Sequence, residues 1–537
     1  MTTTTRVSPP PTMNFLDRAI GFVAPRTALS RARARMAMGN LAALQRHYEA
    51  ASAGRRTSGW RRSSADPNAA IGPALGLLRD QARDLVRNNP YAESAISTIA
   101  DHAVGWGLTA KTKPKNREAE TAWREWAETT LCDADGLCDF YGLQKLVMRT
   151  VVESGEVLVR RRFRRVDDGF PVPMQIQVLE PDFLDAGKNL ARTPQGGSIV
   201  QGVERDAIGR KVAYWLFQDH PGSNTGLGLG GSVPVAAQNV RHIFRPTRAG
   251  QLRALTWLAP IILRLRDFDE FEDATLMKQK IAACLAVITS DPDGTGAPLG
   301  EASAGATSDA PEVDQIEPGA ILNIRPGRSV EVVQPPQVRE YNDYARNQLR
   351  AIATGIGVTY EDLTGDYADM PFSAARMSRI RHWSRVEDWR WRILIPQMCD
   401  PVFAWWLEAA LIMRRVKDTD EVNVEWTGSP APLVDPVNEG LAFQRNVRAG
   451  IQSLPDAIRE RGYDPADMLQ EIADSNAELD RLGILLDSDP RNVTQAGQLQ
   501  GKAGAAFKAE PAPPAAPPAD DAEDEDRARA LRIAPRR

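Results

Sequence analysis

Two long stretches with the apolar spacing of amphipathic helices, residues 256–283 and 337–355, constrain the fold more than any other feature of this chain. Their apolar residues recur close to the 3.6-residue period of a helix. Between them, residues 285–288 and 321–324 have the pattern of strands, and they flank residues 291–319, which are rich in Gly, Ala, Pro and Asp. This order predicts a small strand-containing lobe carried on a helical stalk.

The patterns on either side of this stalk predict an α+β protein with more helix than strand. Helical spacing precedes residues 156–217, where alternating apolar side chains predict hairpins. Residues 359–372 predict a loop, and residues 436–482 predict helices that are interrupted at Gly450 and Gly462. The tail that follows is first rich in Ala and Pro and then acidic, so we expect it to be disordered.

One long helix is predicted over residues 373–413, with Ser373 as its N-cap. Pro396 and Pro401 lie inside the pattern and predict a kink. Its aromatic residues could stack on bases, but packing in a core is the favoured interpretation. Its arginines are interleaved with acids, which favours a salt-bridged face between subunits over a DNA contact. The two sets are Trp383, Trp389, Trp391, Trp405 and Trp406, and Arg376, Arg379, Arg381, Arg385, Arg390 and Arg392.

The charge of the chain is distributed unevenly. The whole sequence has 66 Lys and Arg against 70 Asp and Glu, but residues 1–64 contain eleven arginines and only two acids, Asp17 and Glu49. The near-neutral total argues against a broad basic face that grips DNA, because phosphate binding needs a surplus of cations. A flexible basic arm over residues 1–65 on an acidic body is predicted instead. Its candidate contact residues are Arg31, Arg33, Arg35, Arg55, Arg56, Arg61 and Arg62.

Motifs for metals, cofactors and catalysis are weak in this sequence. The spacing of Cys132 and Cys138 does not fit a zinc site, so a turn with buried cysteines is predicted. The glycines of residues 226–231 predict a loop, since no strand–turn–helix surrounds them. The five histidines are scattered without a close pair, and neither a P-loop nor a GxSxG motif occurs. We expect a non-enzymatic protein without a cofactor or metal.

The sequence also bears on where the protein is found. It has four cysteines, no run of 18 apolar residues and no apolar signal core near its start. These features exclude a disulfide scaffold and argue against a membrane span. We therefore expect a soluble, intracellular protein.

Six segments in the same order resemble the portal proteins of tailed double-stranded DNA bacteriophages, in the lambda-type family. They include VVESGEVLVRRRF and DLTGDYADMPFSAARMSRIRHW, and the resemblance extends over about residues 14–500. Each segment alone is weakly specific, but the shared order of all six is quite specific to this family. The six segments are residues 78–108, 151–163, 177–185, 202–222, 242–267 and 362–383.

The resemblance implies an α+β, mostly helical portal fold that assembles into a ring. It gives names to the parts already outlined, from the N-terminal arm to a disordered tail. These are the arm (1–65), the wing (66–255), the first stem helix (256–283), the clip (284–336), the second stem helix (337–361), the tunnel loop (362–372), the long kinked helix with a wing strand (373–435), the crown (436–500) and the tail (501–537).

The resemblance also implies a biological role. Portal proteins form rings of about twelve subunits at one capsid vertex, through which double-stranded DNA is packaged and ejected. The implied partners are the terminase large subunit, the major capsid or scaffolding protein and a head-tail adaptor protein. The implied location is the virion, after assembly in the host cytoplasm, with no membrane contact.

Two groups of residues are candidates for the DNA channel. By resemblance, Asp366, Tyr367, Asp369 and Met370 are the contact residues of the tunnel loop. This loop has no Lys or Arg, which favours a steric or hydrogen-bonding collar over an electrostatic clamp. On the first stem helix, an acidic face is expected to line the channel or to contact neighbouring stems. Its residues are Asp267, Glu270 and Asp273.

Two alternatives come from different classes of protein. A packaging nuclease or motor is disfavoured because the sequence lacks a P-loop and a clustered acidic metal site. A minor capsid or adaptor protein without a channel would share the predicted helices, and imaging of the assembled particle would separate it from a portal ring.

Overall fold

The computed structural model divides the chain into two compact units. One contains residues 1–76 and 246–254, and the other contains residues 77–245 and 255–537. In the part of the chain that the structure describes, no helix combines the length and apolarity needed to cross a membrane. The described residues are 26–27, 30, 33–34, 55–60, 63–112, 117–224, 230–284, 287–290, 321–324, 341–417, 422–484, 486 and 491.

In the smaller unit, one buried amide joins two distant segments. The 3₁₀ turn η2 (Arg55–Thr57) precedes α3 (Pro67–Ile71) and the 3₁₀ turn η3 (Gly72–Ala74). Asn68 in α3 donates to the carbonyl of Gly250 at 3.0 Å and accepts from the amide of Leu252 at 2.7 Å. The side chain of Asn68 thus connects α3 to residues 246–254 through two hydrogen bonds.

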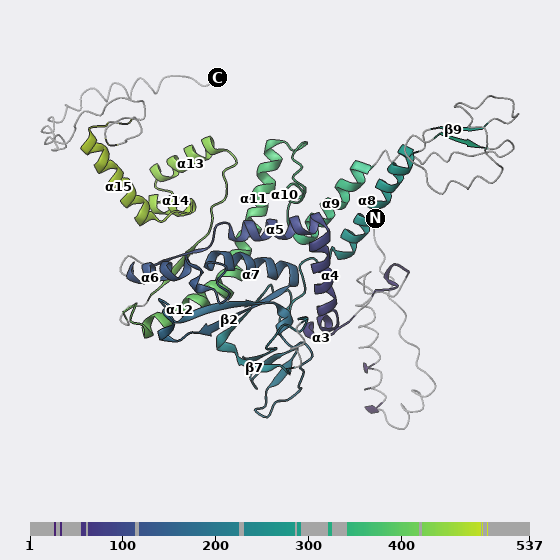
Figure 1. The fold of residues 1–537 in the computed structure, drawn as a ribbon, viewed down its shortest axis with the longest axis horizontal. Helices are drawn as coiled ribbons and strands as arrows, with labels where there is room; N and C mark the ends of the chain where they lie inside the picture. The colour runs from purple at the N-terminus through teal and green to yellow at the C-terminus, as the bar shows by residue number, and fades with distance from the viewer. Residues whose placement is uncertain are drawn as a thin grey trace, which may run out of the picture. The chain divides into compact units, whose positions relative to one another are not determined.

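The larger unit is built around an antiparallel three-stranded sheet. Its strand order is β3 (Met174–Leu179), β2 (Glu156–Phe163) and β8 (Val240–Phe244). The helices α5 (Pro90–Val104) and α7 (Phe140–Ser154) pack against each other beside this sheet (Figure 1). The predicted hairpin region is confirmed here.

The junction between α7 and β2 requires glycine. Gly155 has φ +90°, and a Cβ atom there would lie 2.3 Å from the backbone carbonyl carbon of Leu255. The helix can therefore turn directly into the strand only because this residue lacks a side chain.

Two further sheets complete this region. The first is antiparallel, and its order is β4 (Ser198–Val200), β5 (Val203–Arg205), β6 (Lys211–Leu216) and β7 (Val233–Ala236). The second pairs β1 (Thr109–Thr112) with β11 (Val424–Thr427), which brings together segments far apart in the sequence. The glycine-rich loop predicted over residues 226–231 lies mostly outside the described residues.

An aromatic cluster forms the centre of the core, and α6 (Arg117–Ala127) supplies its middle residue. The ring centroid of Trp123 lies 5.0 to 5.2 Å from those of Trp126, Phe140, Phe403 and Trp406. Trp389 and Trp405 are also buried, whereas Trp391 is 57% exposed and donates to Glu387. Trp383 is partly buried and also packs against this core. Core packing is therefore confirmed for four of the five predicted tryptophans, and Trp391 is the exception.

The turn that contains Cys132 and Cys138 is organised by an aspartate. The side chain of Asp133 is buried and accepts hydrogen bonds from the amides of Asp135, Leu137 and Cys138. This confirms the predicted turn with buried cysteine, because Cys132 is fully buried beside it.

The long helix predicted over residues 373–413 is present and is interrupted as expected. It consists of α11 (Phe372–Trp389), the π-helical segment η9 (Arg390–Cys399) and α12 (Asp400–Ile412). Pro396 cannot donate to the carbonyl of Arg392, and the side chain of Gln397 donates to it instead at 3.4 Å. Gln397 also exchanges two hydrogen bonds with the backbone of Phe244, so the irregular turn is anchored to β8.

Two predicted helix starts are wrong. The first stem helix, α8 (Ile262–Cys284), begins six residues later than expected, because Pro260 disfavours helix at the preceding residue and the amides of Ile261 and Ile262 both turn back to Leu258. The helix α11 begins at Phe372, and Pro371 rather than Ser373 precedes it as the N-cap.

The helices α8 and α9 (Tyr341–Ile356) form an antiparallel pair. Phe271 of α8 stacks on Tyr341 with a ring separation of 6.0 Å, and the Arg264 side chain donates to Gln348 further along. Beyond the end of α8, β9 (Val287–Ser290) pairs in parallel with β10 (Ile321–Ile324), which confirms the predicted strand pair. Residues 291–319 lie outside the described residues.

Near the C-terminal end lie α13 (Pro436–Arg448), α14 (Leu454–Glu460) and α15 (Pro465–Leu482). The predicted breaks are confirmed, since Gly450 and Gly462 both have positive φ angles between these helices. Each helix is also capped by a side chain that accepts a backbone amide, and these caps are Asp435, Ser453 and Asp464. None of the three helices has a buried residue. The tail predicted to be disordered lies outside the described residues.

Candidate functional site

The loop expected to contact DNA is shorter than predicted. Residues 362–364 belong to a short helix, α10 (Tyr360–Thr364), so the loop itself contains residues 365–371. Thr359 caps α10 by accepting from the amide of Asp362 at 3.1 Å, and Gly365 ends it with φ +70°. Both signals are in the sequence, where Thr359 stands three residues before Asp362 and a glycine follows the helix.

The four predicted contact residues lie in a tightly hydrogen-bonded turn. The amide of Met370 donates to the carbonyl of Tyr367 at 3.2 Å, and the amide of Ala368 donates to Asp366 at 3.2 Å. Tyr367 is 58% exposed and Asp369 is also exposed, whereas Asp366 and Met370 are half-buried. The turn therefore presents one aromatic and one acidic side chain to the surroundings.

A residue that sequence reasoning missed neutralises this turn. Arg346 of α9 forms ion pairs with Asp366 at 3.4 Å and with Asp369 at 2.7 Å. The amide of Ala368, the hydroxyl of Tyr360 and the charge of Arg346 lower the pKa of Asp366. The loop sequence itself lacks a base, but α9, which precedes α10, provides one in Arg346. Only the phase of α9 relative to the loop could have indicated this pairing.

The predicted acidic face of α8 is accessible. Asp267, Glu270 and Asp273 are all exposed, and Glu270 also pairs with Arg266 on the same helix at 3.1 Å. A neighbouring acid, Glu272, instead accepts from the hydroxyl of Tyr341 at 3.1 Å. Asp267 and Asp273 have no ion pair within the part of the chain that the structure describes, and their role stays a prediction.

The basic arm lies largely outside the described residues. Arg33 and Arg55 are exposed, and Arg56 belongs to η2. Arg31, Arg35, Arg61 and Arg62 lie outside the described residues. The proposed contacts of this arm therefore stay predictions.

Two arginines of α11 and η9 donate to backbone carbonyls within the chain. Arg385 donates to the carbonyl of Gly357 at 2.6 Å, and Arg390 is buried. Arg390 donates to the carbonyls of Ala103 at 2.7 Å and Ser429 at 2.8 Å. Arg390 also pairs with the interleaved acid Glu387 at 3.0 Å. The salt-bridged face between subunits stays a prediction for the exposed arginines of this helix.

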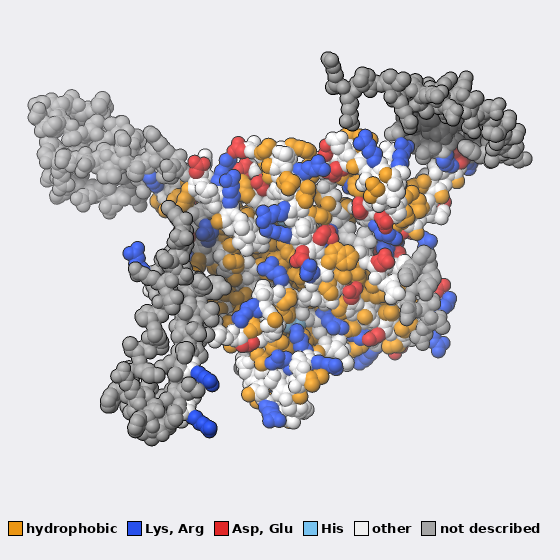
Figure 2. Space-filling view, turned by 180° about the vertical axis from the view of Figure 1, so that it is seen from behind, with side chains coloured by type: hydrophobic (Ala, Val, Ile, Leu, Met, Phe, Trp, Pro, Cys, Tyr) orange, Lys and Arg blue, Asp and Glu red, His pale blue; other side chains and the backbone are white. Residues whose placement is uncertain are grey.

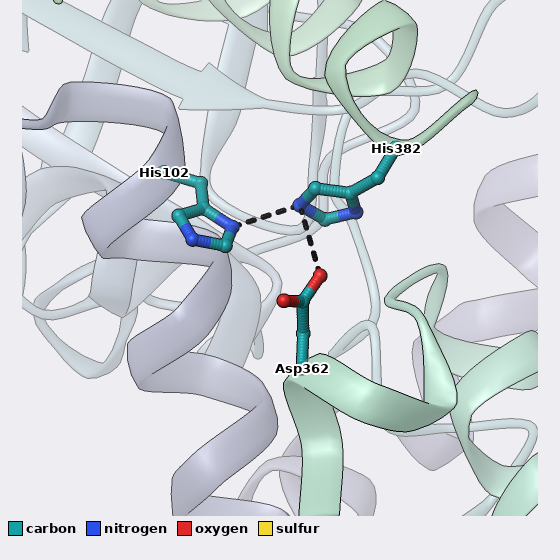
Figure 3. A group of neighbouring side chains, drawn as sticks. All are labelled: His102, Asp362 and His382. Carbon is teal, nitrogen blue, oxygen red and sulfur yellow. Dashed lines mark hydrogen bonds and ion pairs between the residues drawn. The ribbon is translucent and has the colours of Figure 1, made fainter. Parts of the chain in front are cut away.

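Behind the loop, three side chains from three helices converge, as Figure 3 shows. Nδ1 of His102 in α5 lies 2.8 Å from Nε2 of His382 in α11, and a carboxylate oxygen of Asp362 in α10 lies 3.9 Å from the same Nε2. Burial lowers the pKa of both histidines, and that of His382 falls to about 4. Both imidazoles are therefore neutral at neutral pH. Sequence spacing gave no sign of this pair, since 280 positions separate the two residues.

The family model for the lambda family of phage portal proteins matches residues 53–390. The portal protein of Escherichia phage N15 is 24% identical over 479 residues, which cover 79% of this chain and 88% of that protein. Portal protein B of Escherichia phage lambda is 24% identical over 460 residues, which cover 75% and 84% of the two chains.

A third relative is the probable portal protein of Halomonas phage phiHAP-1, 24% identical over 461 residues that cover 82% of this chain and 88% of that protein. The observed fold is the mixed, mostly helical architecture of a portal protein. Because the family model matches more than half of the sequence, this chain belongs to the lambda family of phage portal proteins. The resemblance inferred from six ordered segments is confirmed.

Solved structures of gene transfer agent particles are also similar. A chain in the neck of the native particle, computed with C12 symmetry, is 15% identical, with a TM-score of 0.39 over 76% of this chain and 98% of that chain. A chain in the neck of the empty particle, computed with C6 symmetry, is 14% identical, with a TM-score of 0.40 over 76% and 97%.

Proposed function

We propose that about twelve copies of this chain form a ring at one capsid vertex, and that double-stranded DNA enters and leaves the capsid through its centre. The ring is a non-enzymatic conduit and part of the virion. Membership of the portal family supports this role, and the exposed acidic flank of α8 is the observation that carries the DNA channel. Carboxylates repel phosphates, so a channel lined by them lets a duplex slide without being held.

The loop over residues 365–371 forms the narrow collar of this channel. Its acids are paired with Arg346, so the loop presents neither a strong clamp nor a strong barrier to phosphate. Tyr367, which is exposed at the tip, contacts the duplex by size and hydrogen bonding. On the face of the molecule that Figure 2 shows, the basic and acidic side chains of the described residues are interspersed with apolar ones.

The parts of the subunit follow from the same proposal. The helices α8 and α9 are the stem, β9 and β10 belong to the clip, and α13 to α15 belong to the crown. The sheets around β2 and β6, with α4 (Leu75–Asn88) to α7, form the wing, to which α12 and β11 also belong. The clip meets the terminase large subunit during packaging and a head-tail adaptor protein afterwards. The wing contacts the major capsid or scaffolding protein.

Imaging the purified chain tests the ring directly. Negative-stain electron microscopy is expected to show a twelve-fold ring with a central hole. Solid particles or monomers only would reject the ring and favour an adaptor or minor capsid protein. A metal-dependent nuclease assay on the same sample is expected to show no cleavage of linear DNA.

A charge-reversal experiment tests the channel. The double variant Asp267→Lys with Asp273→Lys is expected to form rings but to slow packaging, because new cations would hold the phosphates. The matched control is Asp80→Lys with Asp84→Lys on α4, where both residues are also exposed. Equal packaging by the two double variants would contradict an acidic channel wall.

Deletion of residues 366–370 tests the collar. Rings are expected to form, but packaged DNA is expected to leak, because the narrowest part of the channel is lost. The point variant Tyr367→Ala is expected to have the same effect in weaker form. Normal DNA retention by the deletion variant would reject the collar.

A further inference from the structure

The three side chains behind the loop have the arrangement of metal ligands. One donor atom each from His102, Asp362 and His382 lies within 4.8 Å of the other two. An ion held by two imidazole nitrogens at about 2.0 to 2.1 Å, with a ligand angle between about 90° and 109°, places these nitrogens about 2.8 to 3.4 Å apart. The observed separation of 2.8 Å, at which the two rings are hydrogen-bonded in the absence of an ion, lies at the lower limit of that range.

The carboxylate is positioned on the open side of the pair. Its 3.9 Å distance from Nε2 of His382 is too long for a direct hydrogen bond and leaves a gap between the three groups. The hydroxyl of Thr359 donates to Asp362 at 2.7 Å and holds this carboxylate in place. A hydrogen bond of this kind to a ligand carboxylate is typical of metal sites.

The surroundings favour a ligand over a purely structural contact. His382 is only 3% exposed, and its Nδ1 has no hydrogen-bond partner among the described residues. The group also lines a cavity of about 240 Å³, together with Tyr367 and Met370 of the loop. A cavity of this size holds an ion with water in its remaining coordination positions. Arg379 and Glu361 also line the cavity. The charges of Arg379, Arg385 and Arg390 act on the two histidines and oppose a cation, whereas the carboxylate of Asp362 favours one.

We propose that Nδ1 of His102, Nε2 of His382 and a carboxylate oxygen of Asp362 bind a divalent transition-metal ion such as Zn²⁺. Two imidazoles and one carboxylate suit zinc or a similar ion, whereas calcium and magnesium require oxygen ligands. Water from the cavity completes the coordination. Because α5, α10 and α11 each supply one ligand, the ion joins the three helices at the base of the loop over residues 365–371.

This site goes beyond the proposed channel and does not depend on it. If the channel is present, the ion fixes the support on which the collar rests. If the chain were an adaptor instead, the same ion would still join the same three helices. The two proposals are separable because metal content is measured on purified protein without DNA.

Metal content is the direct test. The full chain is treated with a chelator, dialysed against Zn²⁺ and then against buffer, and analysed for zinc per chain. One ion per chain is expected. His382→Ala is expected to weaken Zn²⁺ binding by at least about 100-fold, since loss of even an outer partner costs a factor of about 10 to 100. Co²⁺ is the second probe, because its absorption spectrum reports imidazole ligands and coordination number.

The matched control is another histidine beside carboxylates. His220 lies 3.2 Å from Glu180 and is grouped with Asp182, but it is more exposed than His382. His220→Ala is expected to leave zinc content and the Co²⁺ spectrum unchanged. If the histidine variants fail to fold, the zinc content of Asp362→Asn tests the site instead. The asparagine side chain has nearly the same shape, and its carbonyl oxygen can still accept the hydrogen bond from the hydroxyl of Thr359. Circular dichroism verifies the fold of each variant.

Three results would overturn the site. They are a wild-type chain that retains no zinc, zinc retention unchanged in folded His382→Ala or Asp362→Asn, and an equal loss in His220→Ala. Ring formation is imaged in parallel. Rings without zinc would reject the metal site alone, and zinc without rings would reject the proposed ring alone.

Discussion

The body of the larger unit and the C-terminal helices α13 to α15 are both mainly helical, but different forces hold them. In the body, Trp123 and Trp406 are buried within an aromatic cluster. The C-terminal helices have no buried residue, and charged contacts link them to the body. Lys111 lies 3.4 Å from Asp464, and Arg117 lies 3.1 Å from Asp467. Apolar burial fixes the body, whereas the C-terminal helices depend on caps and ion pairs that can open separately.

The largest difference is expected from removing an aromatic side chain. Trp123→Ala should lower the free energy of unfolding of the body by about 3 to 5 kcal/mol, because it leaves a cavity among four aromatic rings. Chemical denaturation followed by circular dichroism measures this. The control is Trp391→Ala, which removes an exposed ring. Similar losses for the two variants would contradict the assigned centre of the core.

The same glycine substitution should have opposite effects in the two regions. At Gly355 in α9, a new Cβ would lie 2.3 Å from Cγ2 of Ile261, so Gly355→Ala should destabilise the α8–α9 pair by about 1 to 3 kcal/mol. At Gly440 in α13, no described atom apart from the nearby backbone of its own helix lies within 4 Å of such a Cβ. Gly440→Ala should therefore stabilise its helix by about 0.5 to 1 kcal/mol. Thermal unfolding of both variants measures the signs, and equal signs would refute this contrast.

Removing one cation should loosen only the C-terminal helices. Lys111 is surrounded by Glu120, Asp464 and Asp467 at 3.4 to 3.7 Å, so Lys111→Ala should cost about 1 kcal/mol. Hydrogen exchange read by mass spectrometry should become faster in α15 and stay unchanged in β2. As a control, Lys145→Ala removes an exposed pair with Asp101 and should change neither segment. Faster exchange throughout the body would show that the two regions are not separable.

Acid should produce the smallest effect. Burial alone would raise the pKa of Asp464, but the amide of Asp467 and the charge of Lys111 outweigh it and lower this pKa. A carboxyl group with a lowered pKa stabilises the fold above its unfolded value of about 3.9 and loses that contribution as the pH falls through the folded value. Exchange in α15 should therefore differ between wild type and Asp464→Asn at about pH 5, and the difference should shrink as the pH falls below the unfolded value of about 3.9. A constant difference would contradict this ionisation.

Local patterns in the sequence predicted much of this fold. Alternating apolar residues gave the hairpins, Pro396 gave the irregular turn in the long helix, and Gly450 and Gly462 gave the breaks near the C-terminal end. The errors also had local causes, since Pro260 delays α8 and Thr359 with Gly365 builds α10 inside an expected loop.

Contacts between distant segments could not be predicted in the same way. Arg346 in α9 pairs with Asp366 and Asp369 of the loop. His102 contacts His382, which lies 280 positions later in the sequence. Periodicity assigns a residue to a face of its own helix but does not say which other helix that face meets. The candidate contact residues of the loop were therefore identifiable, but the charge that pairs with them and the histidines behind them were not.

The π-helical segment η9 also bears on how this chain could tolerate a deletion. A turn closed between residues five apart, as from the amide of Asp400 to the carbonyl of Ile395, holds more residues than an ordinary turn over a similar rise. The loss of Pro396 itself, the residue here that cannot donate to a helical carbonyl, can be absorbed by tightening the stretch to an α-helix without turning α12 away from its core. A chain shortened at this position can therefore keep the mutual orientation of the loop and the aromatic core.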